Sequence, residues 1–317
     1  MKAEMTFHTP VLADDVVRLA EVTPGDRWVD CTLGFGGHST SLLERGASVI
    51  GIDQDADART FTKQRLARFD DQIHIVAGNF GDVAELLDES GDGPVDGILA
   101  DIGVSSFQLD EAERGFSFRR PGPIDMRMNR DVGESALELI KRLTQKELTR
   151  ILKRYGEEPL AGVIARAIKA WATEHVDDDT TALAAIIAEA MPNRVRSKLK
   201  HHPATRTFQA LRIAVNDELG ALERLLAAIP ACLKPGGRAL VISFHSLEDR
   251  LVKRAFNRWS GRNVQPGPGG RALPVVQRPA FELLTTKPVT ASAEECGANP
   301  RARTAKLRAV RKLENAA

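Results

Sequence analysis

Short apolar runs alternate with stretches of helical spacing through the first third of the chain. Runs of this kind, closed by glycine or acidic residues, are typical of strands buried on both faces of a parallel sheet. The predicted strands begin at Trp28 and cover Val49–Ile52, Ile73–Val76 and Val95–Ala100, and the predicted helices cover Ala13–Ala20, Ala56–Phe69 and Val83–Leu87. This alternation predicts an α/β fold.

The alternation stops near residue 108, where a different pattern begins. Apolar stripes at helical spacing follow one another, and Gly133 and Gly156 separate them. The predicted helices are Glu134–Arg142, Gln145–Tyr155, Pro159–Glu174 and Thr181–Met191. This part of the chain therefore predicts an all-α domain.

The α/β pattern returns after the helical stretch. A long amphipathic helix is predicted over Phe208–Ile229 and a tight turn over Lys234–Arg238. A fifth strand at Ala239–Phe244, a helix at Leu247–Trp259, a glycine-rich loop at Gln265–Gly270 and two last strands at Phe281–Thr285 and Ala305–Lys312 complete the pattern. We therefore predict a discontinuous α/β domain, residues 1–107 and 207–317, with an inserted helical domain at residues 108–206.

A glycine cluster follows the first strand. Gly34, Gly36 and Gly37 have no Cβ, and a helix can open behind them, so a ligand can lie against bare backbone. The second strand ends in Asp53, about 20 residues further on, where an acid can bind the two hydroxyls of a ribose. The sequence therefore predicts a nucleoside-cofactor site. Since Gly37 directly follows Gly36, the spacing is not that of a dinucleotide-binding dehydrogenase.

Residues just beyond the other strands are further candidates, because strand ends face the ligand in sheets of this type. Asp101 follows the fourth strand. Phe80 follows the third, where it can lie against a purine ring or pack into the core, and both interpretations remain open. His8, beside a proline, is interpreted as a capping or packing residue.

Composition is that of an ordinary globular protein, with 317 residues, 43% hydrophobic and 27% charged. The net charge of +1 means that any affinity for nucleic acid must come from local patches. The three cysteines, Cys31, Cys232 and Cys296, form no C-x-x-C pair, which favours a reducing compartment. No apolar segment resembles a signal peptide or a membrane span, so we expect a cytoplasmic protein with no membrane partner.

Two segments are strongly basic. Residues 194–206 hold five cations and no acid, and residues 301–312 hold six cations and no acid. Such runs are often solvated faces, but two of them favour a polyanionic partner. Residues 114–128 interleave arginines with aromatic residues, which suits a flipped base. An ordered loop whose aromatics pack on the helical domain explains the same composition, and this alternative remains open.

Other catalytic chemistries find little support. Ser243 and His245 stand close together at a strand end, without the G-x-S-x-G elbow of hydrolases. No H-E-x-x-H or similar spacing predicts a metal site. The run Asp177–Asp179 is interpreted as the solvated start of a helix.

Longer motifs carry a family resemblance. They are His8–Leu12, the glycine loop through Ser39, Asp101–Asp110, Glu113–Phe118, Gly122–Met128, His202–Ile213, Ile242–Arg250 and Asn299–Arg303. In these stretches the chain resembles the bacterial ribosomal small-subunit methyltransferase H family, also called MraW, nearly from end to end. Phe35 and Phe107 depart from it, since an arginine and a proline are usual there.

The resemblance implies a class I, Rossmann-like methyltransferase sheet, mostly parallel with an antiparallel edge strand, and an inserted all-α domain. It implies S-adenosylmethionine as cofactor, 16S ribosomal RNA in the small subunit as partner, and the exocyclic N4 of a cytidine in the decoding region near the P site as target. Carried over by motif, the cofactor contacts are Gly36, Gly37, His38, Asp53, Phe80, Asp101 and Gln108. The predicted RNA contacts are Arg114, Arg119, Arg127, Arg206, Arg301 and Arg303.

Asp101 is also the predicted catalytic residue, because a cytosine amine needs an acceptor that turns its lone pair toward the methyl group. The alternatives are that Asp101 only binds the cofactor, or that Asp125 or the strand end Ser243–Ser246 polarises the amine. Other interpretations of the whole chain are a nicotinamide dehydrogenase, a DNA or other RNA amino-methyltransferase, and a non-catalytic RNA-binding assembly protein. The sequence leaves a monomer and a homodimer both open.

Overall fold

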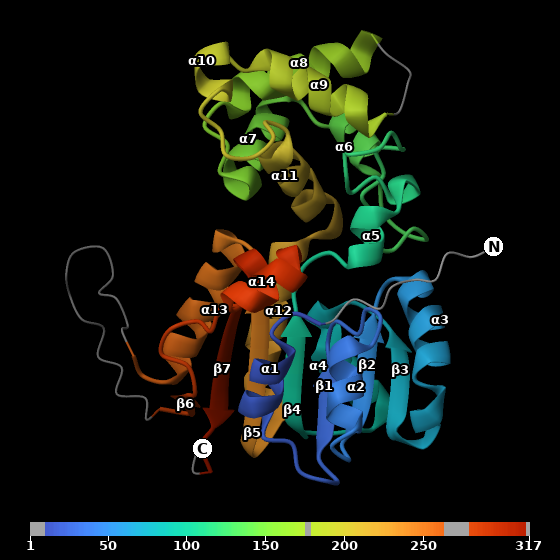
Figure 1. The fold of residues 1–317 in the computed structure, drawn as a ribbon, viewed down its shortest axis with the longest axis vertical. Coiled ribbons are helices and arrows are strands. Elements are labelled where there is room, and N and C mark those ends of the chain that lie inside the picture. Colours follow the sequence, from blue (N-terminus) through green and yellow to red (C-terminus); the bar gives the residue numbers. More distant parts are fainter. Residues whose placement is uncertain (1–9, 175–178, 263–278, 315–317) are drawn as a thin grey trace. The chain divides into compact units, whose positions relative to one another are not determined.

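The computed structural model describes residues 10–174, 179–262 and 279–314. The chain forms two compact units (Figure 1): an α/β unit, Met1–Gly103 with Leu219–Ala317, and a helical unit, Val104–Glu218. The second boundary lies later than the sequence-predicted one, because Phe208, Ala210 and Leu211 of the helix before it are buried in the core of the helical unit. His8, Asp177, Asp178 and the predicted loop Gln265–Gly270 lie outside the described residues.

The α/β unit is built on a sheet of seven strands in the order β3-β2-β1-β4-β5-β7-β6 (Figure 1). The strands are β1 (Arg27–Asp30), β2 (Ser48–Asp53), β3 (Ile73–Ala77), β4 (Val95–Asp101), β5 (Leu233–Ser243), β6 (Phe281–Leu283) and β7 (Lys306–Lys312). The first five run parallel, and β7 pairs antiparallel with both β5 and β6. The predicted fold class, a mostly parallel sheet with an antiparallel edge, is confirmed.

Alternate residues of each central strand enter two separate apolar layers. Ile98 and Ala100 of β4 pack in one layer, and Leu99 between them packs in the other, all three with no exposed surface. Helices α4 (Val83–Ser90), α12 (Glu218–Cys232) and α13 (Ser246–Trp259) contribute to the first layer, and α1 (Ala13–Ala20) and α2 (Gly37–Leu43) to the second. The central strands are apolar throughout because both of their faces are covered.

Two elements of the α/β unit differ from the sequence prediction. Helix α3 (Ala56–Arg65) ends early and is followed by a 3-10 helix, η1 (Ala67–Gln72). The turn predicted at Lys234–Arg238 lies within β5 as an irregular insertion, because the ladder with β4 steps from Leu233 to Arg238. Gly236 in this insertion has a φ of 80°, a conformation that glycine adopts without strain.

The helical unit has its own apolar core. Its elements are α5 (Ser106–Asp110), η3 (Ala112–Arg114), α6 (Ala136–Arg142), α7 (Gln145–Gly156), α8 (Ala161–Glu174), α9 (Thr180–Ala190), α10 (Asn193–Arg196) and α11 (Thr205–Asn216). Leu148, Leu152, Ile164 and Ile187 are fully buried in that core. Ser135 and Thr144 start α6 and α7 with capping boxes, which explains where these helices begin.

The single long helix predicted over Phe208–Ile229 is wrong. Asp217, with a φ of 47°, ends α11, and α12 starts at the next residue. The side chain of Asn216 is hydrogen-bonded to Met126 and Met128 in a distant loop of the same unit. The prediction failed because apolar residues recur at helical spacing on both sides of this break, as they would in one continuous helix. Among the described residues, no helix is long and apolar enough to cross a membrane.

Candidate functional site

The glycine loop connects β1 to α2 at the carboxyl edge of the sheet. Gly36 has a φ of 73°, and a Cβ there would lie 2.8 Å from Cγ2 of Thr62. A Cβ on Gly37 would lie 3.1 Å from Cβ of Pro10. Neither position has room for a larger residue without a shift of its neighbours, so the loop presents backbone alone to any ligand.

His38 and Asp101 meet beside this loop. Nε2 of His38 lies 3.6 Å from Oδ2 of Asp101, and the His38 side chain is only 7% exposed. Both ring nitrogens of His38 and Oδ1 of Asp101 are buried without a hydrogen-bond partner among the described residues. Buried polar atoms in native proteins are nearly always paired, so these three atoms are suited to a polar ligand.

Thr32 fixes the position of Asp101. The backbone N–H of Asp101 donates to Oγ1 of Thr32 over 2.6 Å. The next residue, Ile102, donates its N–H to the carbonyl oxygen of Ile242 on β5 over 2.9 Å. The end of β4 is therefore held from β1 on one side and from β5 on the other, which sets the direction of the Asp101 carboxylate.

Asp53 lies at the end of β2, next to the glycine loop. Its Oδ2 accepts the N–H of Gly34 over 2.8 Å, and its Oδ1 accepts the N–H of Asp55 over 2.8 Å. Burial raises the pKa of Asp53 from 3.8 to about 6, although the two N–H donors act in the opposite direction. Each oxygen retains a lone pair, so the ionised group can still accept two hydroxyl hydrogens.

Asp30 binds residues on both sides of the glycine loop, and the sequence analysis assigned it no role. It is 1% exposed, and its Oδ2 accepts the hydroxyl of Ser39 over 2.6 Å. Its Oδ1 accepts the N–H of Thr32 over 3.2 Å, and burial raises the pKa of this carboxyl. Its signal in the sequence is an acid at the end of a short strand, shortly before the glycines.

The remaining predicted cofactor contacts have different surroundings. Phe80 begins the 3-10 helix η2 (Phe80–Asp82) and is half-buried against the apolar layer of β4 and α12. Gln108 belongs to the helical unit, is 5% exposed, and its Oε1 accepts the N–H of Ser105 in the capping box of α5. The α/β unit thus brings together Gly36, Gly37, His38, Asp53 and Asp101 around the ends of β1, β2 and β4.

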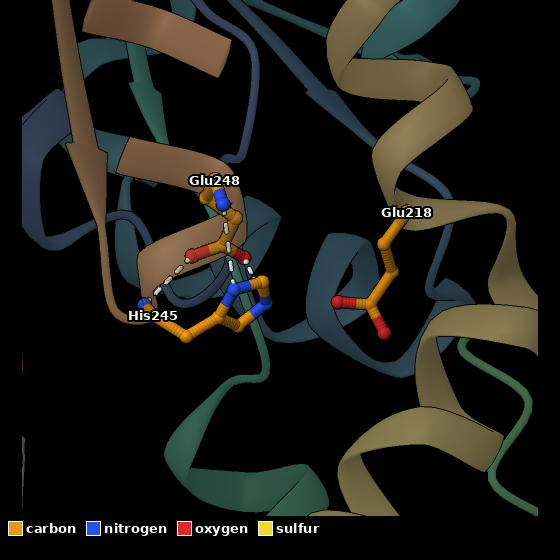
Figure 2. Close-up of side chains that lie close together, drawn as sticks. All are labelled: Glu218, His245 and Glu248. Atoms are coloured by element: carbon orange, nitrogen blue, oxygen red, sulfur yellow. Dashed lines mark hydrogen bonds and ion pairs between the residues drawn. The ribbon is translucent and has the colours of Figure 1, made fainter. Parts of the chain in front are cut away.

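His245 and Glu248 close the end of β5 (Figure 2). Nε2 of His245 lies 3.1 Å from Oε1 of Glu248, whose side chain is fully buried. The other carboxylate oxygen, Oε2, accepts the N–H groups of Phe244 over 2.8 Å and of His245 over 3.1 Å. This pair caps α13 and fixes the strand end, whereas Glu218, also drawn in Figure 2, pairs with Arg212 within the helical unit.

The loop at residues 114–128 packs inward more than it faces solvent. Arg114 is 2% exposed, and its guanidinium donates to the carbonyl oxygens of Arg127 and Met128. Phe116 is buried in the helical core, and Phe118 packs against Phe208 with ring centroids 4.8 Å apart. Because Arg114 is buried, it cannot contact RNA. Phe116 and Phe118 fit the alternative interpretation, in which the aromatics of this loop pack on the helical domain.

The two basic runs differ in what their side chains do. In the second run, Arg308 pairs with Asp249 and Arg311 with Glu282, so much of its charge stabilises β7. The first run remains exposed, although Arg206 donates to the carbonyl oxygen of Glu157. Of the other predicted RNA contacts, Arg119 and Arg303 are exposed, whereas Arg301 is partly buried and Arg127 is partly buried and paired with Asp125.

Comparison with known proteins identifies the family to which the chain belongs. The profile of the MraW methylase family matches residues 5–313. Ribosomal RNA small subunit methyltransferase H of Anaeromyxobacter dehalogenans is 51% identical over 309 residues, with 96% of this chain and 98% of the relative covered. The protein of the same name from Nitratidesulfovibrio vulgaris is 48% identical, with 98% and 97% covered. Among solved structures, an rRNA methylase from Streptococcus thermophilus aligns over 97% of this chain and 99% of its own, with 11% identity and a TM-score of 0.43.

Proposed function

The chain belongs to the MraW methylase family, and from this premise we propose that it methylates the exocyclic N4 of a cytidine in 16S ribosomal RNA. The target cytidine lies in the decoding region of the small subunit, near the P site. Curated relatives that match along nearly the whole chain carry the name of a small-subunit RNA methyltransferase, which supports an RNA substrate. The protein acts where small subunits are assembled, in the cytoplasm.

S-adenosylmethionine is the cofactor, and the residues of the α/β unit fit it. Backbone without side chains at Gly36 and Gly37 can lie against the nucleoside. The ionised carboxylate of Asp53 can accept the two ribose hydroxyls, and the unpartnered nitrogens of His38 can meet the polar groups of the amino-acid part. Phe80 offers an apolar surface for the adenine.

The observation that carries the proposal is the pair of His38 and Asp101, because its orphaned polar atoms lie beside a bare glycine loop. When bound, the cofactor supplies a methyl group on a positively charged sulfur. Held by the glycine loop, Asp53 and His38, it would offer this methyl group to the cytosine N4, and the neutral thioether would be the leaving group. Since N4 shares its lone pair with the ring, Asp101 accepts one N–H and turns the lone pair out of that conjugation.

The product amine must lose a proton, and the carboxylate of Asp101 takes it. Thr32 holds the backbone of Asp101, so the acceptor is in place before the RNA arrives. Holding the reacting groups in line supplies most of the rate enhancement in a transfer of this kind. Nε2 of His38 lies 3.6 Å from Oδ2 of this carboxylate, on the same side of the glycine loop.

The exposed arginines of the helical unit and of the C-terminal segment bind the RNA backbone. Arg119, Arg206 and Arg303 are exposed, and the half-exposed Arg127 and Arg301 flank them in sequence. Guanidinium groups suit phosphate because they donate two parallel hydrogen bonds. These contacts are independent of base identity, so the choice of cytidine is made at Asp101 and its surroundings.

The test is transfer of labelled methyl groups from S-adenosylmethionine to small ribosomal subunits that lack the modification, followed by identification of the product nucleoside. We expect N4-methylcytidine. Duplex DNA and protein-free 16S RNA are tested in parallel. Label in DNA alone, or binding of RNA without transfer, would identify a DNA methyltransferase or a non-catalytic assembly protein instead.

A further inference from the structure

The helical unit contains a pocket of about 280 Å³. Its lining combines two cations, one acid, one hydroxyl and two apolar side chains. The lining residues are Leu109, Asp110, Ala112, Ser117, Arg119 and Arg120. We call it the α5 pocket, since α5 and the turn after it form one wall and the segment 115–123 forms the other.

The two walls are in direct backbone contact. A Cβ at Gly122 would overlap the carbonyl oxygen of Ala112, so only glycine lets the segment approach the η3 turn this closely. Gly115, with a φ of 71°, turns the chain at the start of the segment. Backbone contact between the two segments therefore fixes the spacing of the two walls.

A buried threonine locks the outer wall. Thr180, at the start of α9, has no exposed surface, and its N–H donates to the carbonyl oxygen of Gly122 over 2.9 Å. Its hydroxyl donates to the carbonyl oxygen of Arg120 over 3.2 Å. Arg119 also donates its N–H to the hydroxyl of Ser117 over 3.3 Å. A wall that is ordered before binding lowers the entropic cost of taking up a ligand.

The lining chemistry suits a nucleotide. The exposed guanidinium groups of Arg119 and Arg120 can bind a phosphate with paired hydrogen bonds. Leu109 and Ala112 supply an apolar surface for a base. The volume is close to the lower limit of about 300 Å³ for small-ligand sites, which fits one nucleotide and excludes a double helix.

We propose that the α5 pocket holds a single unpaired nucleotide of the substrate RNA, with its phosphate on Arg119 and Arg120 and its base over Leu109 and Ala112. The inference rests on the proposed function, which makes RNA the substrate. In this proposal the 114–128 loop has two roles: one of its aromatic residues packs in the helical unit, and Arg119 and Arg120 bind RNA. Phe118 packs into the helical unit, and its neighbours on either side line the pocket.

The experiment compares wild-type full-length protein with the double variant Arg119→Ala/Arg120→Ala. We expect the KM for small ribosomal subunits to rise at least tenfold, while kcat and the Kd for S-adenosylmethionine stay within twofold. Binding of a fluorescent single-stranded RNA should show a salt slope smaller by about 1.4, at about 0.7 for each lost phosphate contact. The matched control is Arg166→Ala, because Arg166 is an exposed arginine of α8 in the same unit.

A second variant tests the cavity apart from its charge. Ala112→Phe fills the α5 pocket and keeps both arginines, and we expect it to raise the KM by a similar factor with an unchanged circular-dichroism spectrum. An unaltered KM and salt slope in both variants would overturn the pocket proposal and leave the methyltransferase function standing. If the wild-type protein transferred no methyl group, the proposed function would be overturned. The salt slope of RNA binding would then test the pocket proposal by itself.

Discussion

The backbone N–H of Asp101 donates to Oγ1 of Thr32 over 2.6 Å, and this bond joins the end of β4 to the second residue after β1. The two strands are neighbours in the sheet, so the link crosses from the glycine loop to the proposed acceptor of the N4 proton. A hydroxyl is needed at this position because its oxygen accepts the N–H. An apolar residue of the same shape would leave that N–H unpaired.

Thr32→Val tests this link, because valine has the same shape and no acceptor. We expect a loss of about 1–3 kcal/mol in the free energy of unfolding, the cost of a polar group left unpaired. Turnover should fall as well, since Asp101 loses its fixed direction. Urea unfolding and single-turnover kinetics measure the two effects, and Thr32→Ser should restore both. Equal turnover in Val and Ser variants would contradict the positioning role.

Asp101→Asn separates catalysis from cofactor binding. The amide keeps the size of the side chain but cannot take a proton, so we expect kcat to fall by roughly 10²–10⁴, the usual contribution of a positioned base. The Kd for S-adenosylmethionine, measured by calorimetry, should change less than threefold. Weakened cofactor binding with unaltered turnover would assign Asp101 to the cofactor alone.

The raised pKa of Asp53, about 6, makes cofactor affinity depend on pH. Ribose hydroxyls donate to the ionised form, so binding favours the anion and releases a proton below the pKa. We therefore expect affinity to be constant above pH 7 and to fall by about tenfold for each pH unit well below 6. Calorimetry in buffers of different ionisation enthalpy measures the released proton. Asp53→Asn should bind weakly and without this pH dependence.

In the free protein the same shift acts on stability with a definite sign. The folded-state pKa of about 6 lies above the ordinary value of 3.8, so protonated Asp53 favours the folded state. Its contribution is fully present below pH 3.8 and is lost as the pH rises through about 6. Saturating S-adenosylmethionine should reverse the loss, and thermal unfolding with and without cofactor at pH 5 and pH 7.5 measures it.

Arg206 and Arg303 should contribute to RNA affinity through charge. Each is exposed, and replacement by alanine should reduce the slope of log affinity against log salt by about 0.7 on single-stranded RNA. Arg311→Ala is the comparison, because Arg311 is exposed but already paired with Glu282. Fluorescence anisotropy at several salt concentrations measures the slopes. Equal slopes for all three variants would exclude specific phosphate contacts at the first two.

Asn216 holds a strained segment of the helical unit. Met126 is fully buried with a φ of 62°, and Asn216 donates to its carbonyl oxygen over 2.8 Å while accepting the N–H of Met128 over 2.8 Å. Asn216→Ala should therefore destabilise the helical unit by about 2–4 kcal/mol through these unpaired groups. Hydrogen exchange resolves the effect by unit. A change below about 0.5 kcal/mol would show that the conformation needs no such support.

The strands and the ligand edge of the sheet could be predicted from the sequence because their signals are local. An apolar run followed by Gly34, Gly36 and Gly37 identifies a strand and a loop without knowledge of any partner. The mostly parallel sheet with an antiparallel edge came with the family resemblance, and the order of the strands was not predicted. The inserted helices were predicted for the same reason as the strands, since their apolar stripes and the glycines between them are also local signals.

The features that sequence reasoning missed depend on contacts between distant residues. Asp217 breaks a helix that apolar spacing made continuous, and the side chain of Asn216 before it is bonded to a loop far away in sequence. Arg114 was predicted to contact RNA because arginines and aromatics alternate in its loop, yet two backbone carbonyl groups bind its guanidinium inside the helical unit. Thr32 and Asp30 carried no motif, and only their hydrogen bonds reveal what they support.

Strand β7 has a consequence for biosynthesis. It lies between β5 and β6, so an interior strand of the sheet is made from residues 306–312, after the helical unit has left the translating ribosome. Until those residues emerge, β5 exposes an unpaired edge that can join another nascent chain. A frameshift or premature stop before residue 306 should therefore yield aggregated protein, because the chain then lacks an interior strand of the sheet and not an edge strand.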